Sequence, residues 1–110
     1  MSAENIVSFI RVVSGSLPVL KETKMNTRRK FLERMFEGSG DEITPTALLN
    51  VAFEEECSRF IGVFYEPIME MCKDEITSEK DPSTKQVLIA ARDILSQMYE
   101  DNKDEIEKLH

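Results

Sequence analysis

Residues 44–76 read TPTALLNVAFEEECSRFIGVFYEPIMEMCKDEI, and this stretch decides the fold. Its apolar side chains recur at steps of three and four residues, which is the spacing of one face of an α-helix. The face consists of Leu49, Phe53, Cys57, Phe60, Ile61, Phe64, Ile68, Cys72 and Ile76. A helix with so continuous an apolar face requires a cover, which either the rest of the chain or a partner supplies.

The start of this stretch and its internal proline define the predicted helix. Thr44-Pro45 is typical of a helix beginning, because the hydroxyl caps free amides and proline stands where no amide hydrogen is needed. Pro67 removes the backbone hydrogen bond to the carbonyl of Val63. The apolar face keeps its phase across Pro67, so we predict one helix over about 44–76 that is kinked at the proline and continues beyond it.

Two further helices are predicted before this stretch. The first lies at about 3–14; its β-branched residues also suit a strand, but no second strand candidate is present to pair with it. The second begins after a break at Ser14–Pro18 and runs to about Glu37. A loop at Gly38–Asp41 follows, with Gly38 just past the end of the helix.

A last helix is predicted over about 81–109, opened by a second cap-and-proline pair, Asp81-Pro82. Its apolar seam consists of Leu88, Ala91, Leu95, Met98, Asn102 and Leu109, flanked by Val87, Ile94 and Ile106. With four helices and short connections, the chain is predicted to be all-α and four-helix bundle-like. A length of 110 residues suits a single helical domain spanning 1–110.

Charge is unevenly distributed along this acidic chain. The formal net charge is −7, yet residues 1–34 hold seven Lys/Arg against three Asp/Glu, while residues 35–110 hold seven against eighteen. Either the two parts pack against each other through complementary charge, or the basic residues form a docking patch on an acidic body. The predicted basic patch consists of Lys21, Lys24, Arg28, Arg29 and Arg34.

Standard catalytic and metal-binding patterns are missing from the sequence. The single histidine is the last residue, His110, which leaves no internal Ser-His or Cys-His pair and no histidine-based zinc site. Cys57 and Cys72 lie ~22 Å apart along one helix, too far for a disulfide. No glycine-rich phosphate loop or EF-hand loop occurs. We therefore predict that the chain is not an enzyme and binds no cofactor and no metal.

The sequence also indicates an intracellular protein. The apolar segment 6–13 has no basic region before it and is interrupted by Arg11, unlike a signal peptide. No run approaches the ~18 apolar residues that a membrane span needs. We expect a cytoplasmic or nuclear protein without a membrane partner.

An interaction module is the preferred function. The polar segment Lys21–Lys30 leaves the long apolar helix short of internal cover, and excess apolar surface is typical of an interface. We predict a non-enzymatic adaptor that homodimerises or docks a partner helix in an apolar groove. The predicted groove is lined by Phe53, Phe60, Phe64, Ile68, Met71, Leu88, Leu95 and Met98.

Two alternatives stay open. A nucleic-acid-associated factor would contact phosphates through the basic patch, although no aromatic residue interleaves its charges and the chain as a whole is acidic. A carrier of an apolar small molecule would enclose a sizeable cavity beside Phe60 and Phe64.

Overall fold

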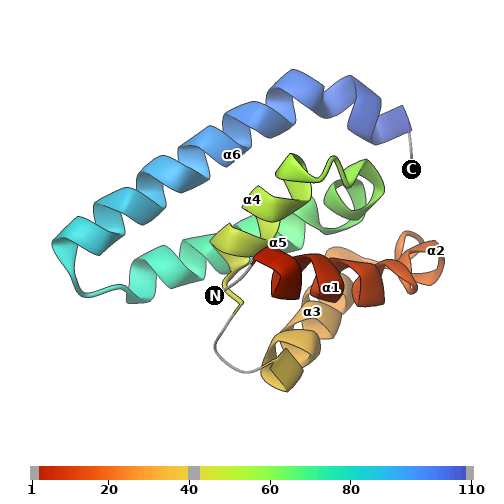
Figure 1. Ribbon diagram of the computed structural model, residues 1–110, viewed down its shortest axis with the longest axis horizontal. Helices are drawn as coiled ribbons and strands as arrows, with labels where there is room; N and C mark the ends of the chain where they lie inside the picture. Colours follow the sequence, from red (N-terminus) through yellow and green to blue (C-terminus); the bar gives the residue numbers. More distant parts are fainter. Residues whose placement is uncertain (1–2, 40–42, 109–110) are drawn as a thin grey trace.

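The computed structural model describes residues 3–39 and 43–108, and within these ranges the chain is all-α, as predicted. The described helices are α1 (Ala3–Ser14), α2 (Leu17–Leu20), α3 (Met25–Ser39), α4 (Pro45–Glu54), α5 (Ser58–Ser78) and α6 (Pro82–Lys108) (Figure 1). The helix predicted at about 3–14, for which a strand was the alternative, is confirmed. Four residues that entered the predictions lie outside the described ranges: Gly40, Asp41, Leu109 and His110.

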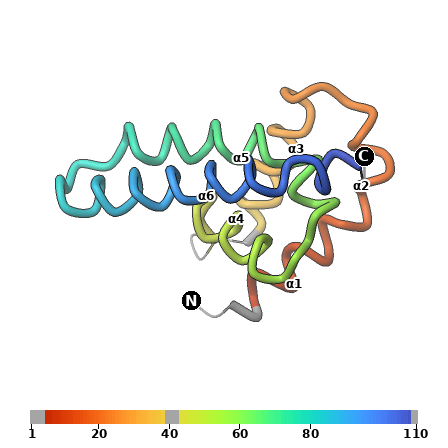
Figure 2. Tube along the Cα trace, turned by 90° about the horizontal axis from the view of Figure 1, so that it is seen from above, coloured from red at the N-terminus to blue at the C-terminus, as the bar shows by residue number. Residues whose placement is uncertain are grey.

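Helix α5 is the centre of the fold. It packs against α2, α3, α4 and α6, while α1 packs against α4 (Figure 2). The ring of Phe64 lies 5.1 Å from that of Phe60 and 6.2 Å from that of Phe31 on α3, measured between centroids. Seven of the nine residues of the predicted apolar face are buried in the core: Leu49, Phe60, Ile61, Phe64, Ile68, Cys72 and Ile76. The chain's own helices therefore cover this face.

The prediction of one continuous helix over about 44–76 is wrong, because the structure interrupts that helix at residues 55–57. The amide of Glu56 donates to the carbonyl of Phe53 (3.1 Å), and the amide of Cys57 donates to that of Ala52 (2.9 Å). This is the Schellman pattern that ends helices. Glu56 has a φ of 54°, a left-handed conformation that glycine usually adopts. Since three consecutive glutamates contain no turn-forming residue, nothing in the sequence marks this break.

Pro67 lies inside α5, and the helix continues through it, as predicted. The carbonyl of Val63, which a proline at position 67 cannot bond, accepts a hydrogen bond from Nη1 of Arg28 at 3.0 Å. The same guanidinium donates through Nε to the carbonyl of Leu20 (3.0 Å) and through Nη2 to that of Lys21 (2.6 Å). One arginine of α3 thus replaces the missing helix bond and caps the end of α2.

The helix predicted from about residue 17 to 37 is also divided, into α2 and α3. The hydroxyl of Thr23 donates to the carbonyl of Leu20 at 2.6 Å and, together with Arg28, satisfies the end of α2. Ser16 precedes α2 without a side-chain cap, and Gly38 lies within α3. These side-chain caps end a helix without glycine or proline, which is why the break is not visible in the sequence.

Both cap-and-proline helix starts are confirmed. The Thr44 hydroxyl accepts from the amide of Ala47 (3.2 Å), and Oδ2 of Asp81 accepts from the amide (3.0 Å) and the hydroxyl (2.6 Å) of Thr84. From Asp81, α6 runs back along α5, and the two helices extend together beyond the others (Figure 1 and Figure 2). In the described part of the chain, no helix combines the length and the apolar content needed to cross a membrane.

Candidate interaction surface on helix α6

Half of the predicted groove residues belong to the interior. Four of the eight are buried beneath the chain's own helices: Phe60, Phe64, Ile68 and Leu95. The groove prediction assumed that the polar segment before α4 leaves α5 uncovered. Instead, Arg28 and Arg29 reach α5 through hydrogen bonds and ion pairs, and Leu20 and Phe31 supply apolar cover at the two ends of that segment. These four side chains are therefore core residues; Phe60 and Leu95 each border a different surface hollow, and the four together form no shared groove.

The other four predicted groove residues are half-buried and lie apart: Phe53, Met71, Leu88 and Met98. Phe53 and Met98 border a hollow of about 370 Å³ beside the α4–α5 turn, and Met71 borders another of about 510 Å³ beside α3. Leu88 borders a third, of about 360 Å³, between α4 and α6. Of these three hollows, only the α4–α6 groove includes a large, exposed apolar side chain, that of Ile94.

Helix α6 carries an exposed apolar stripe along its first half. Val87 and Ile94 are 68% and 62% exposed, and their seven-residue separation places them on one face of the helix, two turns apart. Ala90 is exposed between them, and Ala91 beside it is half-buried. We refer to Val87, Ala90, Ala91 and Ile94 as the α6 surface.

The α6 surface continues into the α4–α6 groove. Ala91 and Ile94 belong to both, and the other wall of the groove is the first part of α4. The groove is lined by Thr44, Thr46, Ala47, Asn50, Leu88, Ala91, Ile94 and Leu95. Its walls are largely apolar or small side chains, so an apolar helix face can approach both α4 and α6 there.

Contacts on the inner side of α6 fix its orientation. Leu95 and Ile106 are buried, and the rings of Tyr65 and Tyr99 are stacked at 3.7 Å between centroids. Burial raises the pKa of both phenols. Because this side is packed on α5, α6 cannot rotate to bury Val87 and Ile94 without losing those contacts.

The predicted basic patch is divided between the interior and the surface. Arg28 bonds three carbonyls, as described above. Arg29 bonds Oε1 of Glu33 at 2.8 Å and forms ion pairs with Glu70 and Asp74 on α5. These carboxylates, Asp74 foremost, raise the pKa of Arg29. Complementary charge between the basic and acidic parts thus holds α3 on α5. Three of the five predicted residues are exposed: Lys21, Lys24 and Arg34.

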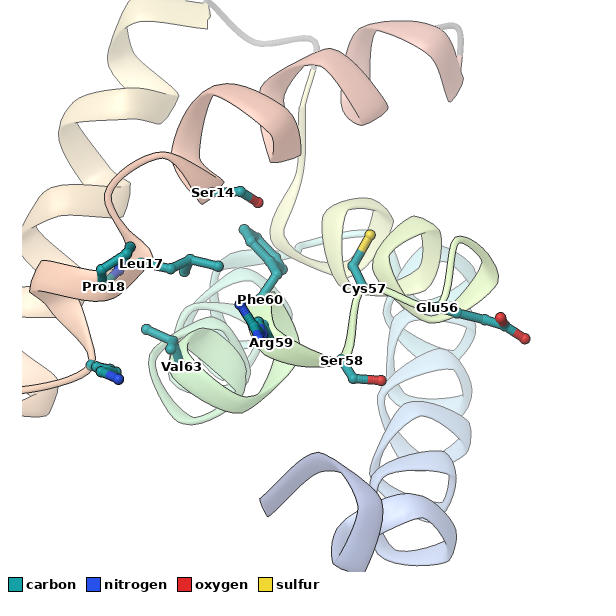
Figure 3. A pocket seen from close by; sticks show the side chains of 10 residues that line it. Ser14, Leu17, Pro18, Glu56, Cys57, Ser58, Arg59, Phe60 and Val63 are labelled. Carbon is teal, nitrogen blue, oxygen red and sulfur yellow. The ribbon is translucent and has the colours of Figure 1, made fainter. Parts of the chain in front are cut away.

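A separate hollow of about 580 Å³ lies where the end of α1, α2 and the start of α5 meet. Figure 3 shows Leu17, Phe60 and Val63 grouped around it, while the side chain of Glu56 points away from them. Lys21 and Arg59 also line it. The carrier alternative requires an enclosed cavity beside Phe60 and Phe64; this hollow lies at the surface and borders Phe60 without Phe64.

Both cysteines are free thiols. Burial raises the pKa of Cys72 to about 11, and burial together with the carboxylate of Glu55 raises that of Cys57. Both side chains are therefore neutral thiols at pH 7, which are poor nucleophiles. In residues 3–39 and 43–108, no three His, Cys, Asp or Glu side chains are grouped closely enough to hold a metal ion.

Val87 and Ile94, the most exposed large side chains of the α6 surface, were not among the predicted groove residues. In the sequence, Val87 and Ile94 stand only at the flanks of the α6 seam. Their seven-residue spacing, with an alanine at position 90 between them, is the available signal. Periodicity alone does not distinguish which of two adjacent apolar faces packs inward, so this signal is not decisive.

Comparison of the chain with protein families, curated proteins and solved structures finds no significant match.

Proposed function

We propose that this chain is a non-enzymatic protein–protein interaction module, an adaptor that binds its partner through the α6 surface. The observation that carries the proposal is the pair Val87 and Ile94, exposed on one face of a helix whose other side is packed on the core. Full burial of a Val or Ile side chain contributes about 1.5–3 kcal/mol. Most of this remains available to an interface, because both side chains are largely exposed.

The form of the surface favours a helix as its partner. The α4–α6 groove runs beside the exposed stripe and is continuous with it through Ala91 and Ile94. An amphipathic helix lying along α6 would place apolar side chains spaced three and four residues apart over both features. Homodimerisation and docking of a helix from another protein both satisfy this geometry.

We also propose that the chain acts in the cytoplasm or nucleus. Cys57 and Cys72 are unpaired thiols, and reducing compartments preserve thiols in that state.

A photo-reactive amino acid at position 87 tests the interaction. It is introduced into the full chain in the cells that produce it, and the matched control carries the same group at Val12, which is similarly exposed but lies on α1. We expect a discrete protein adduct from position 87, absent from position 12 and lost when Ile94→Glu is added. Equal labelling from both positions, or adducts that persist with Ile94→Glu, would contradict the proposal.

A second candidate function, binding of a small apolar ligand with an anionic group, is favoured by the hollow beside Phe60. Its volume of about 580 Å³ lies within the range of known ligand sites. Leu17, Phe60 and Val63 would contact the apolar part, and Lys21 and Arg59 the anionic group. Titration with decanoate followed by calorimetry tests this candidate. We expect binding to weaken at least fivefold in Arg59→Glu and not in Lys24→Glu; absence of binding at millimolar decanoate would refute it.

A further inference from the structure

We propose that the occupant of the α6 surface is the α6 surface of a second copy, packed antiparallel about a twofold axis that passes between Ala90 and Ala91. This inference rests on the proposed function and names its partner. It follows from the arrangement of side chain sizes and charges on either side of that axis.

The side chain sizes on the α6 surface are symmetric about this point. In an antiparallel pair, Val87 of one copy lies opposite Ile94 of the other, since both are three and a half residues from the axis. Ala90 lies opposite Ala91 of the second copy in the same way. Large apolar side chains therefore meet at both ends, and small ones lie at the crossing, where helix axes approach to ~8 Å. An isologous interface requires this self-complementarity.

The charges beyond the apolar centre select the antiparallel orientation. Asp101 is exposed on α6, ten and a half residues from the axis, and Lys80 is exposed in the non-helical segment before α6, at the other end of the shared face; the adjoining Asp81 and Glu100 meet like charges in either orientation. Antiparallel packing brings each Lys80 to the Asp101 of the other copy. A parallel pair would place Asp101 beside Asp101 and Lys80 beside Lys80, so that like charges meet at both ends.

The neighbouring groove enlarges the contact. A second α6 that crosses at Ala90 and Ala91 also lies against the first part of α4, where Thr46, Ala47 and Asn50 line the groove. The apolar face from Val87 to Ile94 spans only ~10 Å of helix, so the area that it buries falls below the ~800 Å² per partner of a standard interface. We therefore expect a weak, reversible dimer with a Kd of about 10–100 µM.

Cysteine cross-linking tests the register directly. In a Cys57→Ser background, Val87→Cys and Ile94→Cys are prepared as separate chains, with Cys72 left in place because it is buried. The mixture is expected to form a disulfide-linked dimer under mild oxidation, whereas each variant alone stays monomeric. In the antiparallel pair, two copies of position 87 lie ~10 Å apart along the axis, beyond disulfide reach.

Other outcomes overturn the inference in distinct ways. Cross-linking of each variant with itself, without a mixed product, indicates a parallel pair. No cross-link in any combination, with a mass near 12.6 kDa at 200 µM protein, indicates a monomer. In that case a photo-adduct between position 87 and a different protein would still support the proposed function. Failure of the dimer inference can therefore be told apart from failure of the proposed function.

Charge substitution supplies the matched solution test. Ile94→Glu is expected to lose at least tenfold in self-affinity, which lowers the dimer fraction at 200 µM, with an unchanged helical circular dichroism spectrum. Val12→Glu introduces the same charge at a similarly exposed apolar position of α1 and is expected to dimerise like the natural chain. Equal dimerisation of the two variants would place the interface elsewhere and overturn the inference.

Discussion

Arg28 donates a hydrogen bond to the carbonyl of Val63, the oxygen that Pro67 deprives of its helical donor. A buried carbonyl without a partner costs about 1–3 kcal/mol. The guanidinium therefore makes a proline tolerable in the middle of the central helix. It also connects three segments, because its other nitrogens bond the carbonyls of Leu20 and Lys21 at the end of α2.

Removing this guanidinium is expected to destabilise the fold. Arg28→Leu loses three hydrogen bonds and leaves the Val63 carbonyl unpaired, so the free energy of unfolding should fall by about 2–3 kcal/mol. Urea denaturation followed by circular dichroism measures the change. Lys24→Leu, a substitution at an exposed cation of the same segment, should change the free energy by less than about 0.5 kcal/mol. Equal effects of the two substitutions would contradict this role of Arg28.

A double-mutant cycle with Pro67→Ala isolates the link to the proline. Alanine at position 67 restores an amide hydrogen to the Val63 carbonyl, so that carbonyl no longer depends on Arg28. We expect Arg28→Leu to cost about 1 kcal/mol less in the Pro67→Ala background than in the natural chain. Additive effects would show that the bond from Arg28 to Val63 does not compensate for Pro67.

Glycine at position 56 is expected to stabilise the chain. Glu56 has a φ of 54°, and the left-handed region costs a residue with a side chain about 1–2 kcal/mol. After the extra chain entropy of glycine, Glu56→Gly should still raise the free energy of unfolding by about 1 kcal/mol and the melting temperature by about 4 °C. Glu54→Gly, at the last position of α4, should instead destabilise by up to about 1 kcal/mol. A lower melting temperature for Glu56→Gly would contradict the left-handed conformation.

Arg28 and Glu56 show why some helix ends could not be predicted from the sequence while two helix starts could. The cap-and-proline pairs at Thr44 and Asp81 are local signals, and both helix starts were identified from the sequence. The breaks after α2 and α4 depend on groups with no such signal. One is made by Arg28, which lies eight residues beyond the carbonyl of Leu20 that it caps, and the other by a glutamate in a conformation typical of glycine. A helix end that depends on a distant side chain or a strained residue is not visible in local sequence.

The candidate surface was harder to predict than the fold for a related reason. Phe60 and Ile94 both lie on apolar helical stripes, so their spacing does not tell core from interface. The distinction depends on whether neighbouring segments cover them. Arg28 and Arg29 attach a polar segment to α5, and that cover could not be inferred from apolar patterning.

Acid is expected to weaken the start of α6. Two hydrogen bonds from Thr84 lower the pKa of Asp81 below its ordinary value of 3.8. The folded chain therefore binds this proton less readily than the unfolded chain, so the stabilisation is complete above 3.8 and is lost as the pH falls through the lower folded-state value. The difference in free energy of unfolding between the natural chain and Asp81→Ala should therefore narrow as the pH falls below 3.8. Urea denaturation at a series of pH values from 7 to 2 measures this difference. A difference that stays constant with pH would contradict the ionised cap.

Glutamate at two apolar positions separates the core from the α6 surface. Phe60 is 1% exposed, so Phe60→Glu places a charge in the interior and removes an aromatic ring; a loss of at least about 4 kcal/mol should leave the chain largely unfolded at 25 °C. Ile94 is 62% exposed, and Ile94→Glu should change the free energy of unfolding of the monomer by less than about 1 kcal/mol. Circular dichroism at 5 µM protein, below the expected dimer range, measures both. A folded Phe60→Glu chain would place Phe60 at an interface, and an unfolded Ile94→Glu chain would remove the basis for a free surface on α6.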